Sequence, residues 1–570
     1  MPDYSPPVAE MMFVLDHVVG LSKLPEHPDL GALDADMVES VLEPAAKLAA
    51  EVIAPLNWEG DQFGAKLKDG SVTTAPGFKE AYAEYRDGGW NAVPFSPDFG
   101  GQGLPWVIAF AVQEMWQAAN MSFGLCPLLN QGAVDAIEHH GSQEQKDFYL
   151  EKLVSGEWTG TMNLTESQAG SDLSAIRSKA EPQDDGTYKV SGQKIYITYG
   201  EHDFTENIIH LVLARLPDAP EGVKGISLFI VPKSLEDGTR NDVICTGIEH
   251  KLGIHASPTC TMQFGDQGGA TGYLVGEANQ GLKYMFTMMN NARLSVGLQG
   301  VAIAERAYQA ALAYAQDRVQ GTALTDKSKR VAIAEHADVK RMLMTMKAQI
   351  EAARALTYDA GLALDLARTG DKVSQAKVDL LTPIVKSWAT DMSLDVTSMG
   401  VQVHGGMGFV EETGAAQYYR DARILPIYEG TNGIQAADFA FRKVVMNGGE
   451  VANAYLSEIS DAANSELLKD SVKALLHLTK NLVNAGAEDP DYVAAASTPY
   501  LNAFGIIAGA GIMERSQKAA QDLLESGNGD SAFLKQKIYT AAFYRDNILP
   551  HAKAYIKAAS EGSTSLLSAS

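Results

Sequence analysis

One glutamate stands among glycine and apolar residues, where a solvated surface charge is not expected. Glu429 follows Tyr428 and the apolar run Ile-Leu-Pro-Ile at 424–427, and Gly430 comes next. Burial with few neighbouring cations raises the pKa of a carboxyl group, by up to about 3–5 units when burial is complete, and so prepares it to accept a proton near neutral pH. The same spacing also fits a glutamate that caps a helix beginning near Thr431. A catalytic base and a helix cap are the two interpretations of Glu429.

A pair of glycines lies upstream of this glutamate. Gly405 and Gly406 belong to the run Gln-Val-His-Gly-Gly-Met-Gly-Phe at 402–409. Two glycines permit a turn, and they also let a backbone approach a ligand closely, because neither carries a Cβ atom. The sequence leaves both interpretations open.

Two polar segments in the middle of the chain present hydroxyls and backbone N–H groups. They are Leu-Thr-Glu-Ser-Gln-Ala-Gly-Ser-Asp at 164–172 and Lys-Ile-Tyr-Ile-Thr-Tyr-Gly at 194–200. A flavin needs hydrogen-bond donors at its pyrimidine edge and at N5, and a flat side chain against its ring; Thr165, Thr198 and Tyr196 have suitable types. Threonine is also an ordinary strand former, so each residue alone has a structural explanation.

The charge balance and the cysteines exclude several classes of protein. The 46 Lys and Arg residues against 71 Asp and Glu residues give a formal charge of −25, which repels polyanions, and the densest basic run, 327–330, is short. We therefore expect no nucleic-acid binding. Cys126, Cys245 and Cys260 lie far apart and without metal-ligand spacing. Neither a disulfide scaffold nor a metal site is predicted.

The sequence also gives an expectation about membranes and location. The N-terminal residues lack a basic segment followed by a cleavage site, and no apolar run approaches the roughly 18 residues of a membrane span. We expect a cytoplasmic protein without a membrane span. The small apolar run 503–513 is expected to pack against other helices.

The hydrophobic periodicity predicts an α+β protein whose helices and strands are segregated. An N-terminal α-helical domain is expected over 1–160, with glycine-rich loops at 88–90 and 97–105 and a helix N-cap at Ser142. A central β-domain is expected over 161–280, with strands at 208–216, 226–231, 243–248 and 260–264 and a hairpin strand near 188–197. Strands are expected to stop there. A C-terminal helical bundle follows over 281–447, broken near 319–333 and 401–408, and then a helical C-terminal extension over 448–570.

Taken in order, these motifs resemble those of the acyl-CoA dehydrogenase family over about residues 80–445. The matching segments are 97–104, 164–172, 192–198, 251–254, 292–293, 402–408 and 428–431. The segment 55–90 and the long C-terminal tail are similar to the extended branch of the family, which includes the 3-methylmercaptopropionyl-CoA dehydrogenases.

The resemblance implies the three-domain arrangement, with FAD held between the β-domain and the bundle and partly by a neighbouring subunit, so that a homodimer is favoured. Glu429 would take the α-proton of an acyl-CoA thioester while the β-hydride passes to flavin N5 and a 2-enoyl-CoA forms. The thioester carbonyl would be polarised by a ribityl hydroxyl and the backbone N–H of the glutamate. The implied cofactor-binding residues are Leu164, Thr165, Ser171, Tyr196, Thr198, Arg318, Gln402, Gly405, Gly406 and Thr431, and the implied substrate-binding residues are Ser171, Arg293 and Gly430.

Two positions bear on how far the resemblance extends. Some relatives carry the base just before the arginine matched by Arg293, where this chain has Ala292, so Glu429 is the remaining candidate. Arg318 matches an arginine that pairs with the FAD diphosphate of the adjacent subunit. The family continues Arg-x-x-Phe-Gly, whereas this chain reads Arg-Val-Gln-Gly at 318–321, which puts the detail of that contact in question.

The leading functional hypothesis is an FAD-dependent acyl-CoA dehydrogenase that passes electrons to an electron-transferring flavoprotein, with 3-(methylthio)propanoyl-CoA as the favoured substrate. A straight-chain fatty acyl-CoA dehydrogenase and an acyl-CoA oxidase are the alternatives within the same chemistry. A DNA-associated family member is disfavoured by the charge of −25. A purely structural role is disfavoured because it needs no base.

Overall fold

The computed structural model describes residues 3–24, 33–486 and 488–568. The chain divides into two compact units, each assembled from separate stretches of sequence. The first unit contains Met1–Ala46, Trp106–Ala118 and Arg293–Ser570, and the second contains Lys47–Pro105 and Ala119–Ala292. The helical segment 1–160 therefore contributes to both units, and α8 (Gly281–Asp317) begins in the second unit and ends in the first.

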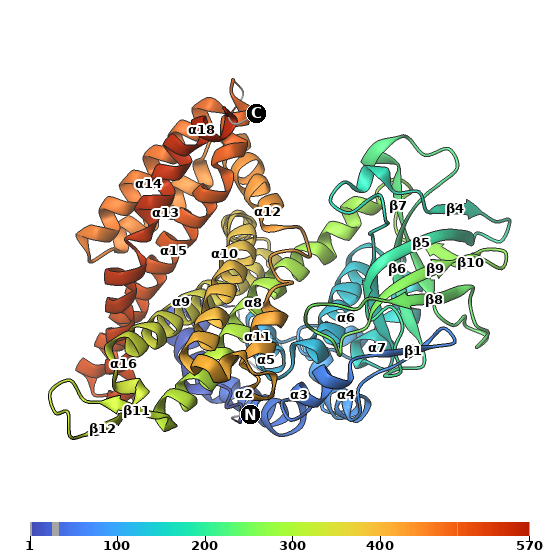
Figure 1. Cartoon of the computed structure of the whole chain (residues 1–570). Helices are drawn as coiled ribbons and strands as arrows, with labels where there is room; N and C mark the ends of the chain where they lie inside the picture. Colours follow the sequence, from blue (N-terminus) through green and yellow to red (C-terminus); the bar gives the residue numbers. More distant parts are fainter. Residues whose placement is uncertain (1–2, 25–32, 487, 569–570) are drawn as a thin grey trace. The chain divides into compact units, whose positions relative to one another are not determined.

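The second unit is a β-structure flanked by short helices (Figure 1). Its strands are β1 (Lys66–Lys68), β2 (Ser71–Thr73), β3 (Thr159–Asn163), β4 (Lys179–Pro182), β5 (Tyr188–Thr198), β6 (Ile208–Arg215), β7 (Ile226–Pro232), β8 (Val243–Ile248), β9 (Thr259–Phe264) and β10 (Ala270–Leu274). Its helices are α3 (Leu56–Phe63), α4 (Phe78–Asp87), α6 (Met121–His140) and α7 (Gln143–Ser155). Ser142 caps α7 in a capping box with Gln145, as the sequence predicts.

Eight strands of this unit form one sheet in the order β10-β7-β6-β4-β5-β9-β8, with β3 beside β6 and a further pairing of β10 with β5. The long strand β5 pairs with β4 and β10 near its start and with β9 towards its end, so it joins the two parts of the sheet. The strands enclose a core of apolar side chains that includes Val190, Val212, Phe229 and Met262. Burial of these apolar surfaces stabilises the sheet on which the polar segments 164–172 and 194–200 are mounted.

Among its described residues, the regular structure of the first unit is helical except for one short hairpin. Its helices are α1 (Val8–Phe13), α2 (Ala35–Leu48), α5 (Trp106–Ala119), the end of α8, α9 (Ala337–Arg368), α10 (Lys372–His404), α11 (Ala415–Ala422), α12 (Asn432–Asp438), α13 (Glu450–Ala462), α14 (Glu466–Ala485), α15 (Pro490–Ser526), α16 (Ser531–Phe543), α17 (His551–Lys557) and α18 (Ser563–Leu567). The long helices α9 and α10 pack along each other, and α8 approaches α10 closely, since a Cβ atom at Gly300 would lie 2.6 Å from the Ala389 carbonyl oxygen (Figure 1). Asp371 caps α10 by accepting hydrogen bonds from the backbone N–H groups of Val373 and Ser374.

The C-terminal extension packs on the bundle through small residues of α15. A Cβ atom at Gly505 would lie 2.6 Å from the Trp388 ring of α10, so only glycine allows the two helices to approach this closely. Phe439, just beyond α12, stacks on Tyr500 of α15 with ring centroids 5.2 Å apart. The apolar run 503–513 is buried along its length. Packing against other helices is therefore its role within the described residues.

Helix α15 also corrects an expectation. It is the one helix among the described residues whose length and composition would suffice to cross a membrane, although no apolar run of that size was expected. However, 72% of its most apolar window is buried inside the protein, as in the core helix of a bundle.

Two further expectations about the elements were wrong. Strands do not stop at residue 280, because β11 (Val319–Thr322) and β12 (Arg330–Ala332) form an antiparallel hairpin at the end of α8. The strands β1 and β2 likewise form a hairpin inside the segment that the periodicity predicted to be helical. The β1–β2 hairpin turns through Asp69 and Gly70, both at positive φ. The α+β class, with helical N- and C-terminal parts and a middle β-domain, is confirmed.

Candidate active site

Glu429 lies in the connection between α11 and α12, in an unusual backbone conformation. Its φ is +56° and that of Gly430 is +86°, so two consecutive residues occupy the left-handed region. A glutamate pays of order 1 kcal/mol or more for this conformation, and such strain in proteins concentrates at functional sites. The connection is held by hydrogen bonds from the backbone N–H of Asn432 to the Pro426 carbonyl (3.0 Å) and from the Gln435 amide to the Glu429 carbonyl (3.3 Å).

The interpretation of Glu429 as a helix cap is wrong. The N-cap of α12 is Thr431, whose hydroxyl accepts a hydrogen bond from the backbone N–H of Ile434 at 3.3 Å. The carboxylate of Glu429 makes no hydrogen bond to any described residue. Glu429 is therefore a partly buried acid that does not cap α12.

Two cations face Glu429 from neighbouring helices. Burial raises the pKa of Glu429 above its ordinary value, and the charges of Arg293 on α8 and Lys386 on α10 oppose this rise. The Arg293 guanidinium lies 3.9 Å from the position of a Cβ atom at Gly430. The structure thus brings the predicted residues Arg293, Glu429, Gly430 and Thr431 together, and it adds Lys386, which sequence analysis missed.

Tyr428, the neighbour of the glutamate, anchors the connection on its other side. Its hydroxyl donates to the side-chain carbonyl of Gln299 on α8, and the Gln299 amide donates to Gln117 on α5 at 3.1 Å. Both glutamines are fully buried, so this chain of polar groups fixes the turn relative to two helices of the bundle.

The second unit carries the other predicted group. Between Lys194 and Ile197 the register of β5 against β9 shifts, and Tyr196 sits in this bulge with φ +60°. The bulge turns the Tyr196 ring outwards, where it is 60% exposed. The backbone N–H of Ile195 donates to the Thr165 carbonyl at 2.9 Å, which places the segment 164–165 beside the bulge.

This arrangement fits a flavin. The hydroxyls of Thr165 and Thr198, both half-buried, form no hydrogen bond with any described residue and so are free for a ligand. With the exposed Tyr196 ring they supply two polar partners and a flat apolar face near the end of β5, which is what an isoalloxazine ring requires. Ser171 lies in the exposed loop that follows the same segment.

A buried ion pair that the sequence analysis missed holds this loop in place. Lys194 and Glu166 are 0% and 5% exposed, and their charged atoms lie 2.8 Å apart. The Lys194 ammonium also donates to the Leu164 carbonyl at 3.0 Å. Glu166 accepts further hydrogen bonds from the Ser178 hydroxyl (2.7 Å) and the Arg177 backbone N–H (2.7 Å). Burial alone would raise the pKa of Glu166, but the Lys194 charge and these donors outweigh it and hold the pKa at about 2.

The remaining predicted residues lie elsewhere on the first unit and are exposed. Gln402, Gly405 and Gly406 are at the C-terminal end of α10, and Arg318 follows the end of α8. At 1.5 Å per residue, Arg318 is about 37 Å further along α8 than Arg293, and Gln402 about 24 Å further along α10 than Lys386. The structure therefore does not bring these four residues to Glu429. A Cβ atom at Gly405 or Gly406 would meet nothing within 4 Å, and so the pair faces open space.

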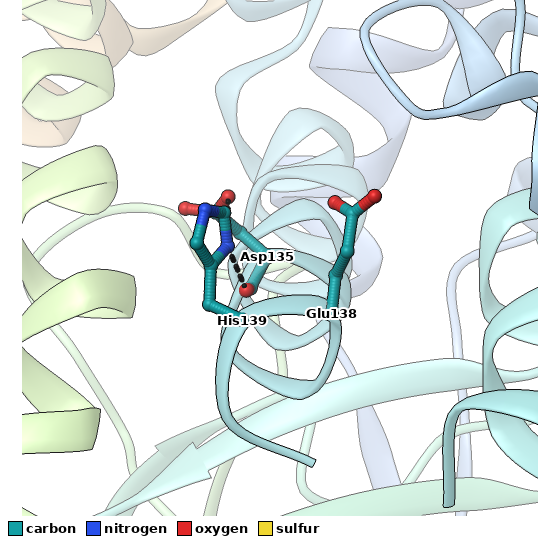
Figure 2. Close-up of side chains that lie close together, drawn as sticks. All are labelled: Asp135, Glu138 and His139. Atoms are coloured by element: carbon teal, nitrogen blue, oxygen red, sulfur yellow. Dashed lines mark hydrogen bonds and ion pairs between the residues drawn. The ribbon is translucent and has the colours of Figure 1, made fainter. Parts of the chain in front are cut away.

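One group of metal-ligand types occurs on α6 (Figure 2). Ligand atoms of Asp135, Glu138 and His139 lie within 4.8 Å of one another. The Nδ1 atom of His139 hydrogen-bonds the Asp135 backbone carbonyl at 2.8 Å, so this nitrogen is engaged within the helix. We assign no metal to this group.

Comparisons with known proteins match most of the chain to one family. Four family models match: "Acyl-CoA dehydrogenase, N-terminal domain" over 38–157, "Acyl-CoA dehydrogenase, middle domain" over 161–267, "Acyl-CoA dehydrogenase, C-terminal domain" over 279–443 and "Acetyl-CoA dehydrogenase C-terminal like" over 449–570.

The chain is 46% identical to a 3-methylmercaptopropionyl-CoA dehydrogenase of Ruegeria pomeroyi over 100% of both chains. It is 37% identical to a butyryl-CoA dehydrogenase of Syntrophomonas wolfei, covering 93% of this chain and 92% of the relative.

Two solved structures share the fold. An acyl-CoA dehydrogenase complexed with FAD from Bacillus anthracis matches with a TM-score of 0.74 at 22% identity, covering 98% of this chain and 94% of that one. A structure described as an electron transferring flavoprotein of Acidaminococcus fermentans matches with a TM-score of 0.60 at 27% identity, covering 71% and 97%.

The fold and these matches define a flavin-dependent dehydrogenase. The chain belongs to the acyl-CoA dehydrogenase family, and its cofactor is FAD.

Proposed function

We propose that this protein catalyses the α,β-dehydrogenation of 3-(methylthio)propanoyl-CoA to its 2-enoyl-CoA, with Glu429 as the base. The observation that carries the chemistry is the Glu429 turn, where a strained, partly buried carboxylate has a raised pKa and no structural partner. The observation that supports the substrate is the 46% identity to a 3-methylmercaptopropionyl-CoA dehydrogenase over the full length of both chains.

Two groups of the turn act on the thioester. The Glu429 carboxylate takes the α-proton, and its raised pKa brings it closer to the pH at which it must accept that proton. The backbone N–H of Glu429 makes no hydrogen bond to any described residue, so it is available to the thioester carbonyl and makes the α-proton easier to remove. FAD, when bound, supplies the acceptor for the hydride that leaves the β-carbon.

Each unit carries some of the proposed ligand-binding residues. In the second unit Leu164, Thr165, Tyr196 and Thr198 would hold the flavin ring, and Ser171 would contact the cofactor and substrate. In the first unit Thr431, Arg293 and Gly430 lie at the Glu429 turn, where Gly430 would leave room for the substrate. Ala292, at the position of the alternative base, has no group that accepts a proton.

The substrate is tested by comparing kcat/KM for 3-(methylthio)propanoyl-CoA, butyryl-CoA and long straight-chain acyl-CoAs. We expect the thioether substrate and butyryl-CoA, whose acyl chain is one atom shorter, to exceed long chains by at least about 10-fold, because each mismatched group in an apolar pocket costs about 1–3 kcal/mol. The 37% identity to a butyryl-CoA dehydrogenase makes butyryl-CoA the second candidate. A preference for long straight chains would contradict the proposal.

We also propose that the protein acts as a homodimer. Arg318 and residues 402–406 are cofactor-binding candidates, yet they lie tens of ångströms along α8 and α10 from the residues that face Glu429. They would therefore bind the FAD of a second copy. The surface around the glycine pair is apolar and open: Phe409 is 89% exposed and Met407 48%. A second copy of this chain would cover it.

Replacing Phe409 by glutamate should weaken this contact, because it puts a charge where an apolar ring is to be buried. We expect light scattering to show a dimer for the wild type and a lower mass for Phe409→Glu, together with weaker FAD retention. Tyr539→Glu on α16 is the matched control, since Tyr539 is an exposed aromatic residue (64%) on another helix. A flavin-loaded, active wild-type monomer would defeat the proposal.

We propose that an electron-transferring flavoprotein accepts the electrons from the reduced FAD. We also propose that the protein is cytoplasmic. The three cysteines are buried and free, as in a reducing compartment. An oxidase would instead produce hydrogen peroxide from dissolved oxygen at a rate comparable to the flavoprotein-dependent reaction. Measuring both rates on one preparation separates the two activities.

A further inference from the structure

Lys386 is a fully buried lysine in the middle of α10, a position that needs an explanation. A buried ammonium is costly unless its protons are hydrogen-bonded and its charge is compensated. Its exposed fraction is 0%, and its Nζ atom donates to the Gly430 carbonyl at 2.7 Å and to the Asn432 side-chain oxygen at 2.8 Å. Gly430 follows Glu429 directly, and Asn432 is the first residue of α12.

Asn432 completes a fixed connection between this turn and α10. Its amide donates to the Ser387 carbonyl (3.1 Å), the Thr390 hydroxyl (3.0 Å) and the Asp391 carboxylate (2.7 Å). Lys386 and Asn432 thus connect the end of the turn to α10. The hydrogen bond from Lys386 to the Gly430 carbonyl restrains the left-handed conformation of Gly430. Because Glu429 is the preceding residue, the same bond restrains its orientation.

The charged groups around this pair come from several elements. Lys386 is influenced by Glu429, Asp391 and Arg293, and burial lowers its pKa to about 7. Burial raises the pKa of Glu429 and the charges of Arg293 and Lys386 lower it, while burial and then the Glu429 charge raise the pKa of Tyr428. Arg293 is itself influenced by Asp438 and Arg442. Lys386 is the member of this set that both bonds the turn and faces the carboxylate.

We infer that Lys386 is a positioning residue for the proposed base: its ammonium holds the Glu429–Gly430 turn on α10 and stabilises the ionised carboxylate from which proton abstraction starts. The inference rests on the proposed function, because it assigns Lys386 a part in the same proton transfer. An opposite charge within about 4–6 Å lowers the pKa of a carboxyl group by about 1–3 units. Without the ammonium, Glu429 would stay protonated to a higher pH.

The test is the pH profile of flavin reduction in the holoenzyme, measured anaerobically with acyl-CoA by stopped flow. In Lys386→Met we expect the pKa that controls reduction to rise by about 1–2 units, with about a 10-fold or greater loss of rate at pH 6–7. Lys386→Arg, which keeps the charge, should show a smaller rise. Should Lys386→Met not yield a folded holoenzyme, Lys386→Gln keeps a hydrogen-bond donor, removes the charge and should show the same rise.

A matched control comes from the same helix. Lys377 pairs with buried Asp359 at 2.8 Å, and its side chain is 24% exposed. Lys377→Met also removes an ion-paired lysine of α10, so it should lower stability but leave the controlling pKa unchanged. An unshifted profile in Lys386→Met and Lys386→Gln, or an equal shift in Lys377→Met, would overturn the inference.

A second readout does not depend on turnover. Infrared titration of the holoenzyme without substrate follows the protonated carboxyl band of Glu429, identified by its absence in Glu429→Gln. The midpoint of this band should rise in Lys386→Met by the same amount as the kinetic pKa. If Glu429→Gln still reduces the flavin, the proposed function fails while this titration still tests the coupling. If Glu429→Gln is inactive but the midpoint does not move, only the role of Lys386 fails.

Discussion

Glu429→Gln is expected to keep the fold and the FAD but to lose flavin reduction by more than the roughly 10²–10⁴-fold that is typical of assisting acid–base groups. The reason is that the glutamine is nearly isosteric and cannot accept the α-proton. Position 292 is an alanine and offers no substitute. The measurement is the anaerobic decay of flavin absorbance after mixing with acyl-CoA, with Glu412→Gln, an exposed acid upstream, as the control that should react at the wild-type rate.

The same variant has an expected effect on stability with a definite sign. The pKa of Glu429 is raised in the folded protein, so ionisation costs stability as the pH rises from the unfolded pKa through the folded one. Glu429→Gln removes this cost. Its unfolding temperature at pH 8 should equal or exceed that of the wild type, while at pH 4 the two should agree. Flavin bleaching at a rate near the wild-type value would show that the proton is removed elsewhere.

The sequence was most informative where one short run of residues determines its own structure. Strand β8 has the predicted bounds Val243–Ile248, and β6, β7 and β9 agree within a residue or two, because each combines β-branched or aromatic residues with turn signals at both ends. Ser142 caps its helix because the capping box lies within four residues. The short hairpins β1–β2 and β11–β12 were not predicted, because strands of three or four residues give no measurable hydrophobic period.

The candidate site was predicted only in part, for a physical reason. Lys386 is 43 residues before Glu429 and Lys194 is 28 residues after Glu166, and a lysine in a helix or strand is ordinarily a solvated one. Their burial follows from tertiary packing, which periodicity does not show. The positive φ of Tyr196 and Glu429 was equally hidden, because non-glycine residues rarely adopt it and the surrounding contacts impose it.

Lys194→Met is the second change with a large expected effect, and it tests how the proposed flavin-binding segments 164–165 and 196–198 are held in place. Removing one member of a buried ion pair costs about 3–5 kcal/mol, because the other charge is left buried without its partner. The substitution also removes the hydrogen bond from the Lys194 ammonium to the Leu164 carbonyl. The segment 164–165 should therefore detach from the bulge at Tyr196. We expect at least a 100-fold weaker FAD affinity and faster hydrogen exchange in peptides covering 164–178.

The control and the pairing partner make this prediction specific to the ion pair. Lys179→Met, at an exposed lysine of β4 in the same unit, should change neither FAD affinity nor exchange. Lys194→Met combined with Glu166→Gln removes the unpaired charge and should recover part of the lost stability, but not the FAD affinity, because the bond to Leu164 is still missing.

The acid dependence of stability gives an independent check on the same pair. With a folded pKa of about 2, Glu166 contributes stability that is present above its unfolded pKa near 4.5 and is lost as the pH falls through 2. At 1.36 kcal/mol per pKa unit this contribution is about 3 kcal/mol. Hydrogen exchange in 164–178 should therefore accelerate in the wild type as the pH falls below 4.5, after correction for intrinsic rates, and Glu166→Gln should lack that acceleration. If residues 164–178 stay protected from exchange and FAD stays bound in Lys194→Met, the ion pair does not position the proposed flavin-binding segments 164–165 and 196–198.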